Sequence, residues 1–228
     1  SHKLRDKALK AIDETTFYPN KGKERLKSMI ETRPDWCVSR QRVWGVPLPI
    51  FVNKKTKEIL VDDDVTENIA SIYEKEGSDC WFSDNPQRFL GKKYKAEDYE
   101  KLSDIVEVWF DSGSTHSFVL EKRDDLKWPA SMYLEGSDQH RGWFHSSLLE
   151  SCGTRGRAPF ESILSHGFVV DGKGLKMSKS LGNVIAPEDI LKKYGADILR
   201  IWVASSNYSE DLRIDYSILD QHADSYRK

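Results

Sequence analysis

The chain has 228 residues, of which 38% are hydrophobic and 32% charged, and its formal net charge is −2 at pH 7. This length and composition indicate a globular protein of one large or two smaller domains, and the charge balance gives no overall signature of a nucleic-acid-binding protein. No apolar run is long enough to span a bilayer, and the start Ser1-His2-Lys3-Leu4-Arg5 lacks the apolar stretch of a secretory signal.

Three cysteines, Cys37, Cys80 and Cys152, lie far apart in the sequence. An odd and sparse set argues against a disulfide framework, and no two of them have the spacing of a zinc knuckle. We therefore expect a reducing, cytoplasmic setting and no protein-bound metal.

Two amphipathic helices are predicted at residues 4–13 and 23–32, because apolar side chains recur there at helical spacing. Between them, residues 17–20 (Phe-Tyr-Pro-Asn) are predicted to form a short extended piece closed by a turn. A segment that alternates aromatic, basic and proline-rich stretches follows at residues 36–51, and it ends in a strand-like Pro-Ile-Phe.

Two arginines of that segment, Arg40 and Arg42, lie between aromatic residues. Such a pattern suits stacking on a nucleotide or contact with the phosphates of an RNA end. An ordinary amphipathic segment fits the same pattern, and the residues alone do not separate the two.

The sequence becomes charge-rich over residues 52–104. A hairpin turn is predicted at residues 53–56 and a helix at residues 64–76, with Asp64 and Glu67 forming a capping pattern. The buried stripe of this helix is expected to consist of Ile69, Ile72 and Tyr73. We interpret the region as an inserted subdomain.

Three apolar segments after it are predicted strands, each followed by a polar loop and then by helical sequence. They are Ile105 to Phe110, Ser131 to Leu134, and Ser162 to Val170. This repetition predicts a parallel α/β sheet, in which ligands bind beyond the carboxyl ends of the strands. Functional residues are therefore expected directly after each strand.

The C-terminal part is predicted to be helical. Pro187 suits a first helical position, with the acidic pair Glu188 and Asp189 at the positive end of the helix dipole. Gly195 is expected to end this helix, and further helices are predicted at residues 196–205 and 212–228.

The loop from Gly172 to Asn183 contains Lys176-Met177-Ser178-Lys179-Ser180 between glycines. Two lysines three residues apart can neutralise a triphosphate as its α–β bond breaks, because fixed cations stabilise developing negative charge. A solvated basic turn is the ordinary explanation of a lysine-rich loop. The position of this loop between a predicted strand and a predicted helix favours the functional interpretation.

The connection after the second predicted strand carries an acid, a glycine and further polar residues. Glu135 can accept hydrogen bonds from a ribose or an ammonium group, and Gly136 lets the backbone approach a ligand. Asp138 and Gln139 add polar contacts, and Trp143 lies one helical turn beyond Gln139. A plain strand-to-helix connection capped by Ser137 or Asp138 is the alternative.

Two further residues stand at predicted strand ends. Trp109 is expected to end the first strand and wall a pocket, with Asp111 and Ser112 organising the loop behind it; a core tryptophan next to a turn fits as well. His166, at the end of the third strand, is placed to face an adenine or phosphates, although a lone strand histidine is more often an ordinary polar residue.

These blocks, in this order, resemble the isoleucyl-tRNA synthetases, a family of class I aminoacyl-tRNA synthetases. The sequences Trp-Phe-Asp-Ser-Gly-Ser-Thr-His at 109–116 and Asp-Gln-His-Arg-Gly-Trp-Phe-His at 138–145 favour this family over its valine and leucine relatives. The resemblance implies the C-terminal half of a Rossmann-like, nucleotide-binding parallel sheet with an inserted α+β subdomain and C-terminal helices. The implied regions are 1–51 (leading helices and start of the Rossmann-like half), 52–104 (insertion), 105–186 (adenylate site and lysine loop) and 187–228 (helical stem-contact region).

The resemblance also implies roles for individual residues. Lys176 and Lys179 would be catalytic. The implied ATP-binding residues are His166, Val169, Lys176, Met177, Ser178, Lys179 and Ser180. The residues implied to bind the aminoacyl-adenylate are Glu135, Gly136, Asp138, Gln139, Trp109 and Trp143.

The implied reaction activates isoleucine with ATP, accompanied by Mg²⁺, and then transfers it to the 3′ end of tRNA. The tRNA would be bound mostly by regions outside this chain, no membrane would be involved, and the parent enzyme would be a monomer. No covalent enzyme intermediate is needed, so positioning and charge stabilisation suffice.

The sequence also departs from the family pattern. None of its six histidines lies in a His-x-Gly-His motif, and the editing insertion and the anticodon-binding region are missing. We therefore expect a fragment of the catalytic domain that is inactive alone. The alternatives are a non-catalytic module that binds nucleotide or tRNA, and a fragment of a valyl- or leucyl-tRNA synthetase.

Overall fold

The computed structural model describes residues 3–228. The chain divides into two compact units, each described here by itself. Unit 1 comprises Ser1–Arg33 and His116–Lys228, and unit 2 comprises Pro34–Thr115. Within residues 3–228, no helix is both long enough and apolar enough to cross a membrane.

Unit 1 is built on a three-stranded sheet in the order β1-β7-β6, and both strand pairs are parallel. The strands are β1 (Thr16–Tyr18), β6 (Tyr133–Gly136) and β7 (Ser162–His166). The carboxyl ends of all three strands lie at one edge of the sheet, where Gly136 is paired with His166. The predicted parallel sheet is confirmed, but the prediction did not place β1 in it.

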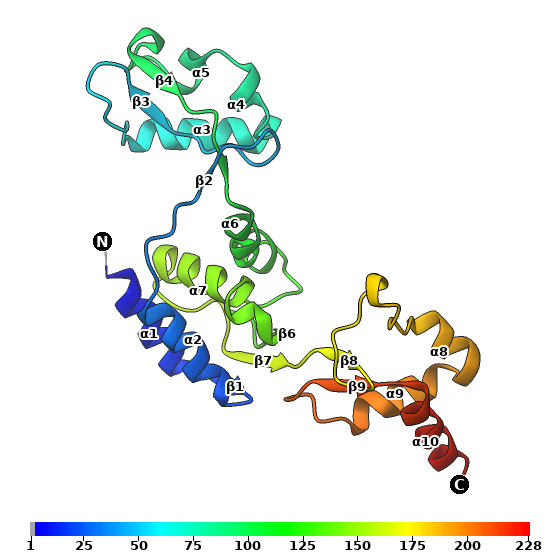
Figure 1. The fold of residues 1–228 in the computed structure, drawn as a ribbon. Coiled ribbons are helices and arrows are strands. Elements are labelled where there is room, and N and C mark those ends of the chain that lie inside the picture. The colour runs from blue at the N-terminus through cyan, green and yellow to red at the C-terminus, as the bar shows by residue number, and fades with distance from the viewer. Residues whose placement is uncertain (1–2) are drawn as a thin grey trace. The chain divides into compact units, whose positions relative to one another are not determined.

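Helices α1, α2 and α7 form the packed layer of unit 1 (Figure 1). α1 packs against both of the others, and the fully buried side chains Ile12, Leu26 and Leu148 each come from a different one of the three helices. The bounds are α1 Leu4–Glu14, α2 Lys21–Glu31 and α7 Trp143–Thr154. Both leading helices are confirmed, with α2 starting two residues earlier than predicted.

The predicted strand from Ser162 to Val170 is two strands in two different sheets. β7 ends at His166, and the chain resumes as β8 (Val169–Asp171), which pairs in parallel with β9 (Leu212–Ile214). The break occurs at Gly167, where a β-carbon would lie 2.2 Å from the backbone oxygen of Glu210. This close approach of two backbones redirects the chain out of the first sheet.

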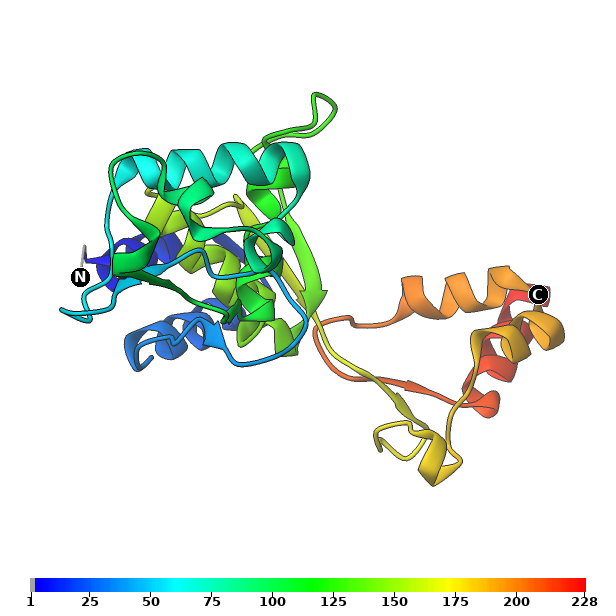
Figure 2. The same ribbon diagram turned by 90° about the horizontal axis from the view of Figure 1, so that it is seen from above.

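The C-terminal helices of unit 1 form a core of their own. Figure 2 shows β8 and β9 side by side, with the helices α8, α9 and α10 beyond them. Their bounds are α8 Pro187–Tyr194, α9 Ala196–Ser205 and α10 Tyr216–Arg227. The buried cluster that joins them comprises Ile190, Ile198, Trp202, Ile214, Leu219 and Ala223. The helices predicted at Pro187 and at 196–205 are confirmed, whereas the segment predicted as a helix at 212–228 begins with the strand β9.

Unit 2 contains two antiparallel strand pairs, β2 with β5 and β3 with β4. The strands are β2 Ser39–Arg40, β3 Phe51–Asn53, β4 Tyr99–Lys101 and β5 Ile105–Val106. The helices are α3 Asp63–Glu76, α4 Cys80–Ser83, α5 Pro86–Leu90 and α6 Val108–Gly113. The core cluster comprises Phe51, Val65, Ile69, Ile72, Trp81, Phe89 and Leu90.

The predicted strand from Ile105 to Phe110 is wrong for most of its length. Only Ile105 and Val106 are extended, and they pair antiparallel with β2 rather than joining the parallel sheet. The side chain of Glu107 accepts a hydrogen bond from the backbone N–H of Trp109 at 3.1 Å and thereby starts α6. Trp109 therefore lies in the first turn of a helix, not at a strand end.

The predicted helix of the insertion is confirmed, but its cap is not the predicted one. α3 is capped by Asp62, whose carboxylate accepts a hydrogen bond from the backbone N–H of Val65 at 3.2 Å. Asp62 also accepts hydrogen bonds from Lys93 and from the hydroxyl of Tyr94. These side-chain hydrogen bonds, led by that from Lys93, lower the pKa of Asp62 to about 2.

Candidate functional site

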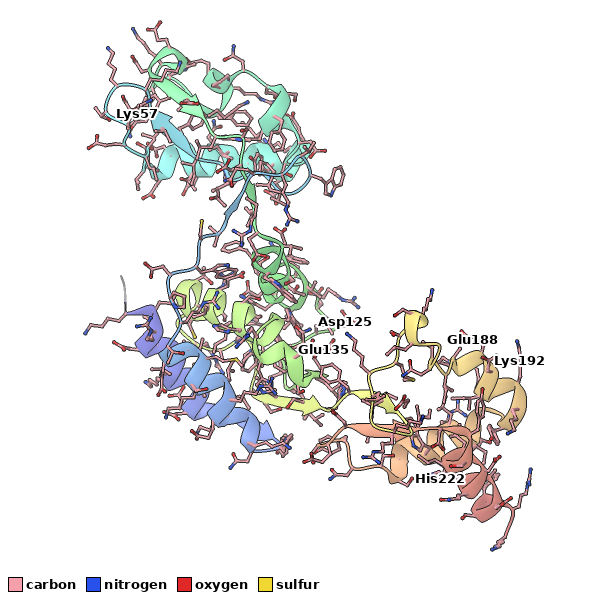
Figure 3. The ribbon with its side chains drawn as sticks, in the orientation of Figure 1. Lys57, Asp125, Glu135, Glu188, Lys192 and His222 are labelled. Carbon is pink, nitrogen blue, oxygen red and sulfur yellow. The ribbon has the colours of Figure 1, made fainter. Side chains whose placement is uncertain are left out.

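The carboxyl end of β6 brings together Glu135, Gly136 and Asp138. The Glu135 side chain is exposed at the end of its strand (Figure 3), and its carboxylate accepts a hydrogen bond from the backbone N–H of Gly136 at 3.3 Å. A β-carbon on Gly136 would lie 2.6 Å from Oδ1 of Asp138 and 3.7 Å from Cε1 of His166. A side chain at position 136 would have to displace the Asp138 carboxylate, so glycine leaves the backbone open between two predicted ligand-binding side chains.

Gln139 organises the start of α7. It lies in the 3₁₀ turn Ser137–His140, and its Oε1 accepts a hydrogen bond from the backbone N–H of Trp143 at 2.8 Å. Its Nε2 donates to Oδ2 of Asp138 at 3.1 Å. The connection is therefore held by Gln139, and neither Ser137 nor Asp138 provides the cap considered from the sequence.

The ring of Trp143 is stacked on Tyr133, with centroids 4.0 Å apart and planes 2° from parallel. Tyr133 is buried, and its hydroxyl lies 3.1 Å from the hydroxyl of Ser147. Burial raises the pKa of Tyr133 to about 12, so the phenol is neutral. The stack and the hydrogen bond fix the orientation of Trp143 against Tyr133, the first residue of β6. Trp109 belongs to unit 2, where it is 42% exposed.

A cavity of about 540 Å³ lies beyond the carboxyl ends of β1 and β7, all of it within unit 1. His166 is the one predicted ATP-binding residue in its wall, and its Nδ1 lies 2.8 Å from the carbonyl oxygen of Gly167. The wall also contains Gly174, near the start of the lysine loop. Lys176 to Ser180 are not part of the wall.

Three basic residues of the cavity wall were not predicted as site residues: Lys21, Arg25 and Arg213. Lys21 forms an ion pair with Glu210, at 2.9 Å between Nζ and Oε1. The first two lie in the first turns of α2, which follows β1, and the third lies in β9. Had β1 been predicted as a strand of the parallel sheet, α2, which follows it, would have been expected to form a wall of the site.

The predicted lysine loop connects β8 to α8 within unit 1. Lys176 and Lys179 are both exposed, whereas Met177 packs against the C-terminal core cluster. The hydroxyl of Ser178 accepts a hydrogen bond from the backbone N–H of Leu181 at 3.3 Å and caps the 3₁₀ turn Lys179–Leu181. Val169 lies in β8 and is 43% exposed. The loop thus presents its two cations to solvent from a backbone anchored on the core.

The sequence matches the family described as tRNA synthetases class I (I, L, M and V) over residues 1–215. It is 90% identical, over all of its length, to an isoleucine–tRNA ligase of Pelagibacter ubique, and 57% identical over 99% of its length to one of Zymomonas mobilis. The chain spans about a quarter of the length of these curated relatives, 25% and 24% respectively.

Solved structures of related enzymes share the fold. A Mycobacterium tuberculosis methionyl-tRNA synthetase in complex with methionyl-adenylate aligns with a TM-score of 0.62 at 19% identity, covering 97% of this chain and 35% of the other. The Agrobacterium radiobacter K84 agnB2 LeuRS, in a ternary complex with tRNA and LeuAMS, aligns with a TM-score of 0.57 at 21% identity, covering 85% and 27%. With the Rossmann-like parallel sheet and the match over residues 1–215, the chain belongs to the class I tRNA synthetases of the I, L, M and V group.

Proposed function

We propose that the chain is the second half of the catalytic domain of an isoleucine–tRNA ligase. The identity to isoleucine–tRNA ligases over the whole chain supports this assignment. The proposed reaction with ATP is supported by one observation above all. Two exposed lysines, Lys176 and Lys179, lie on an anchored loop that follows a strand and precedes a helix.

In the proposed reaction, a carboxylate oxygen of isoleucine attacks the α-phosphorus of ATP, and the bond to the β-phosphate bridging oxygen breaks. Pyrophosphate leaves and isoleucyl-adenylate forms. Lys176 and Lys179 act as fixed cations that stabilise the negative charge growing on the departing pyrophosphate. A terminal ribose hydroxyl of tRNA then attacks the carbonyl carbon, and AMP leaves.

Mg²⁺ would enter this reaction as part of the ATP complex. Within residues 3–228, no three His, Cys, Asp or Glu side chains are grouped so as to hold a metal ion.

The residues around the carboxyl edge are proposed to bind the adenylate. Gly136, Asp138 and Gln139 offer an open backbone and polar side chains beside His166, and Glu135 offers an exposed carboxylate. The rigid, stacked ring of Trp143 suits one wall of the pocket for an apolar side chain. The assignment of Trp109 to the same pocket rests on the resemblance alone.

We assign tRNA binding mainly to the rest of the ligase, with the helices α8 to α10 as the contribution of this chain. We assign the parent enzyme to the cytoplasm, as a monomer. The three free cysteines, Cys37, Cys80 and Cys152, are compatible with a reducing compartment.

The test uses the intact ligase carrying Lys179→Ala. Removing one donor to a developing oxyanion typically lowers kcat by about 100-fold or more, so we expect a loss of about that size in isoleucine-dependent ATP–pyrophosphate exchange. Lys192→Ala is the matched control, because Lys192 is an exposed lysine on α8 (Figure 3). Exchange by Lys179→Ala within about threefold of the wild-type rate would overturn the proposal.

A further inference from the structure

The carboxylate of Asp171, the last residue of β8, ties together the first part of the lysine loop. Its Oδ1 accepts hydrogen bonds from the backbone N–H groups of Lys173, at 3.0 Å, and Leu175, at 2.8 Å. Its Oδ2 accepts a hydrogen bond from Nδ2 of Asn183 at 2.8 Å. These donors, Asn183 first, hold the pKa of Asp171 below its ordinary value, so the group is ionised at neutral pH.

The carboxamide of Asn183 ties the far end of the loop to its middle. Besides Asp171, Nδ2 donates to the backbone oxygen of Lys176 at 3.2 Å, and Oδ1 accepts from the backbone N–H of Ser178 at 2.9 Å. The amide therefore hydrogen-bonds to the backbone of the residues on both sides of Met177. Every polar atom of the side chain is used, so its orientation is fixed by its partners.

The two side chains connect the lysines to the sheet. Asp171 is paired with Ile214 in the β8–β9 ribbon, which supplies a rigid base. From that base the bonds run through Asn183 to Ser178, whose hydroxyl starts the turn in which Lys179 is the first residue. The carbonyl of Lys176 is held by the same amide. The backbone of both lysines is thus held while their side chains are exposed.

We propose that Asp171 and Asn183 form a clamp that positions Lys176 and Lys179 for the leaving pyrophosphate. The inference rests on the proposed function, which assigns the lysines their role. Both clamp members are positioning residues, because they bond the loop backbone rather than a substrate. By restricting the loop before ATP arrives, they reduce the ordering that the transition state requires of it.

The clamp is separable from the stability of unit 1. Asp171 and Asn183 are only half-buried, and neither belongs to the apolar cluster that joins α8, α9 and α10. Their side chains bond to loop backbone and to each other. Loss of these bonds is therefore expected to act on catalysis more than on unfolding.

The experiment exchanges the two side chains in the intact ligase. Asp171→Asn sets the amide of residue 171 against the amide donor of Asn183. Asn183→Asp sets two carboxylates against each other. The double variant restores the bond between positions 171 and 183, because an amide at 171 can donate to a carboxylate at 183 that still accepts from Ser178, but it leaves the backbone oxygen of Lys176 without its side-chain donor. We expect each single variant to lower kcat of ATP–pyrophosphate exchange by about tenfold or more, with the KM for isoleucine within about twofold. The double variant is expected to recover part of that loss, because one of the clamp's bonds is restored while that to Lys176 stays lost.

Matched controls carry the same chemical changes elsewhere. Asp197→Asn alters an exposed carboxylate on α9, and Asn85→Asp replaces the N-cap of α5 by another capping residue. Both are expected to leave kcat unchanged. Melting temperatures and the rate of trypsin cleavage after Lys176 and Lys179 are measured for every variant. Faster cleavage in the single variants, reversed in part in the double variant, is the expected sign of a released loop.

Two results overturn the clamp. One is wild-type kcat in Asp171→Asn and Asn183→Asp while Lys179→Ala is inactive, which leaves the proposed function intact. The other is trypsin cleavage of both single variants at the wild-type rate, because a loop released from its clamp must be cut faster. Asn183→Ala, which leaves the bonds from Lys173 and Leu175 to Asp171 in place, serves where a charged variant does not fold. Full exchange activity of Lys179→Ala would instead defeat the proposed function itself.

Discussion

His145, in the first turn of α7, is a buried histidine with 3% of its surface exposed. Burial lowers its pKa to about 4, and the positive charges of Arg33 and Arg141 act in the same direction. The imidazole is therefore neutral in the folded chain at neutral pH. An unfolded chain would take up a proton on it near pH 6.5.

This difference makes His145 a source of acid sensitivity. Because the pKa is lower in the folded state, the unfolded state binds the extra proton, and stability falls as the pH drops from about 6.5 towards 4. We expect the loss to be about 3 kcal/mol at pH 4. The measurement compares the free energy of urea unfolding at pH 7 and pH 4 for the wild-type chain and for His145→Gln. An equal loss in both proteins would contradict the prediction.

At the scale of elements, the indole of Trp81 holds unit 2 together. Its ring centroid lies 5.0 Å from those of both Phe51 and Phe89, so α4, β3 and α5 meet on it. Its Nε1 donates a hydrogen bond to the backbone oxygen of Leu102 at 2.7 Å. The side chain is fully buried within the core cluster of the unit.

Trp81→Ala is expected to lower the free energy of unfolding of unit 2 by about 3 to 5 kcal/mol, because it leaves a large cavity and an unpaired carbonyl. Trp44→Ala is the control in the same unit, since Trp44 is 90% exposed. Its effect should stay within about 0.5 kcal/mol. Urea unfolding followed by circular dichroism gives both values, and similar losses in the two variants would refute the argument.

Elements of the chain differed in how well the sequence predicted them. The helices α1, α8 and α9 follow from local signals, namely apolar spacing, Pro187 at a helix start and Gly195 at a helix end. The strands β1 and β9 have three residues each and exist through partners far away in sequence. A local pattern carries no information about such partners. The strand prediction for Ile105 to Phe110 was wrong for a different reason: Glu107 caps α6, so the residues after it are helical.

The same distinction applies to the candidate site. Motif residues such as Glu135, Gly136 and Lys179 were found because each was predicted to follow a strand, and their roles stay predictions. Glu135 and Gly136 are in fact the last two residues of β6, because that strand runs two residues further than predicted. Arg25 and Arg213 were missed because they reach the cavity from β1–α2 and from β9, whose places in the fold were not predicted. Asn183 lay inside the predicted loop, but its bond to Asp171, formed across the loop, is visible only in three dimensions.

At the scale of the whole molecule, unit 2 is a continuous segment inserted between two parts of unit 1. Its own core lies around Trp81, and the pairing of β2 with β5 brings its two ends together. A segment whose two ends are paired and which has its own hydrophobic core meets the structural conditions for independent folding.

Residues 34–115 expressed alone are therefore expected to unfold cooperatively in urea, with helical circular dichroism before the transition. Trp81→Ala should destabilise this segment by the same amount as it destabilises unit 2 in the whole chain, since the contacts of Trp81 are internal to the unit. A broad, non-cooperative transition of the isolated segment would contradict this expectation.

The pairing of Thr16 with Ser162 in the parallel sheet has a consequence for biosynthesis. A ribosome that adds about 5 to 20 residues per second makes β1 roughly 7 to 30 seconds before its partner β7 emerges. All of unit 2 is translated within that interval. The insertion can thus complete its fold on the ribosome while β1, between α1 and α2, still lacks its strand partner. The sheet of unit 1 forms only after β7 has been made and pairs with β1.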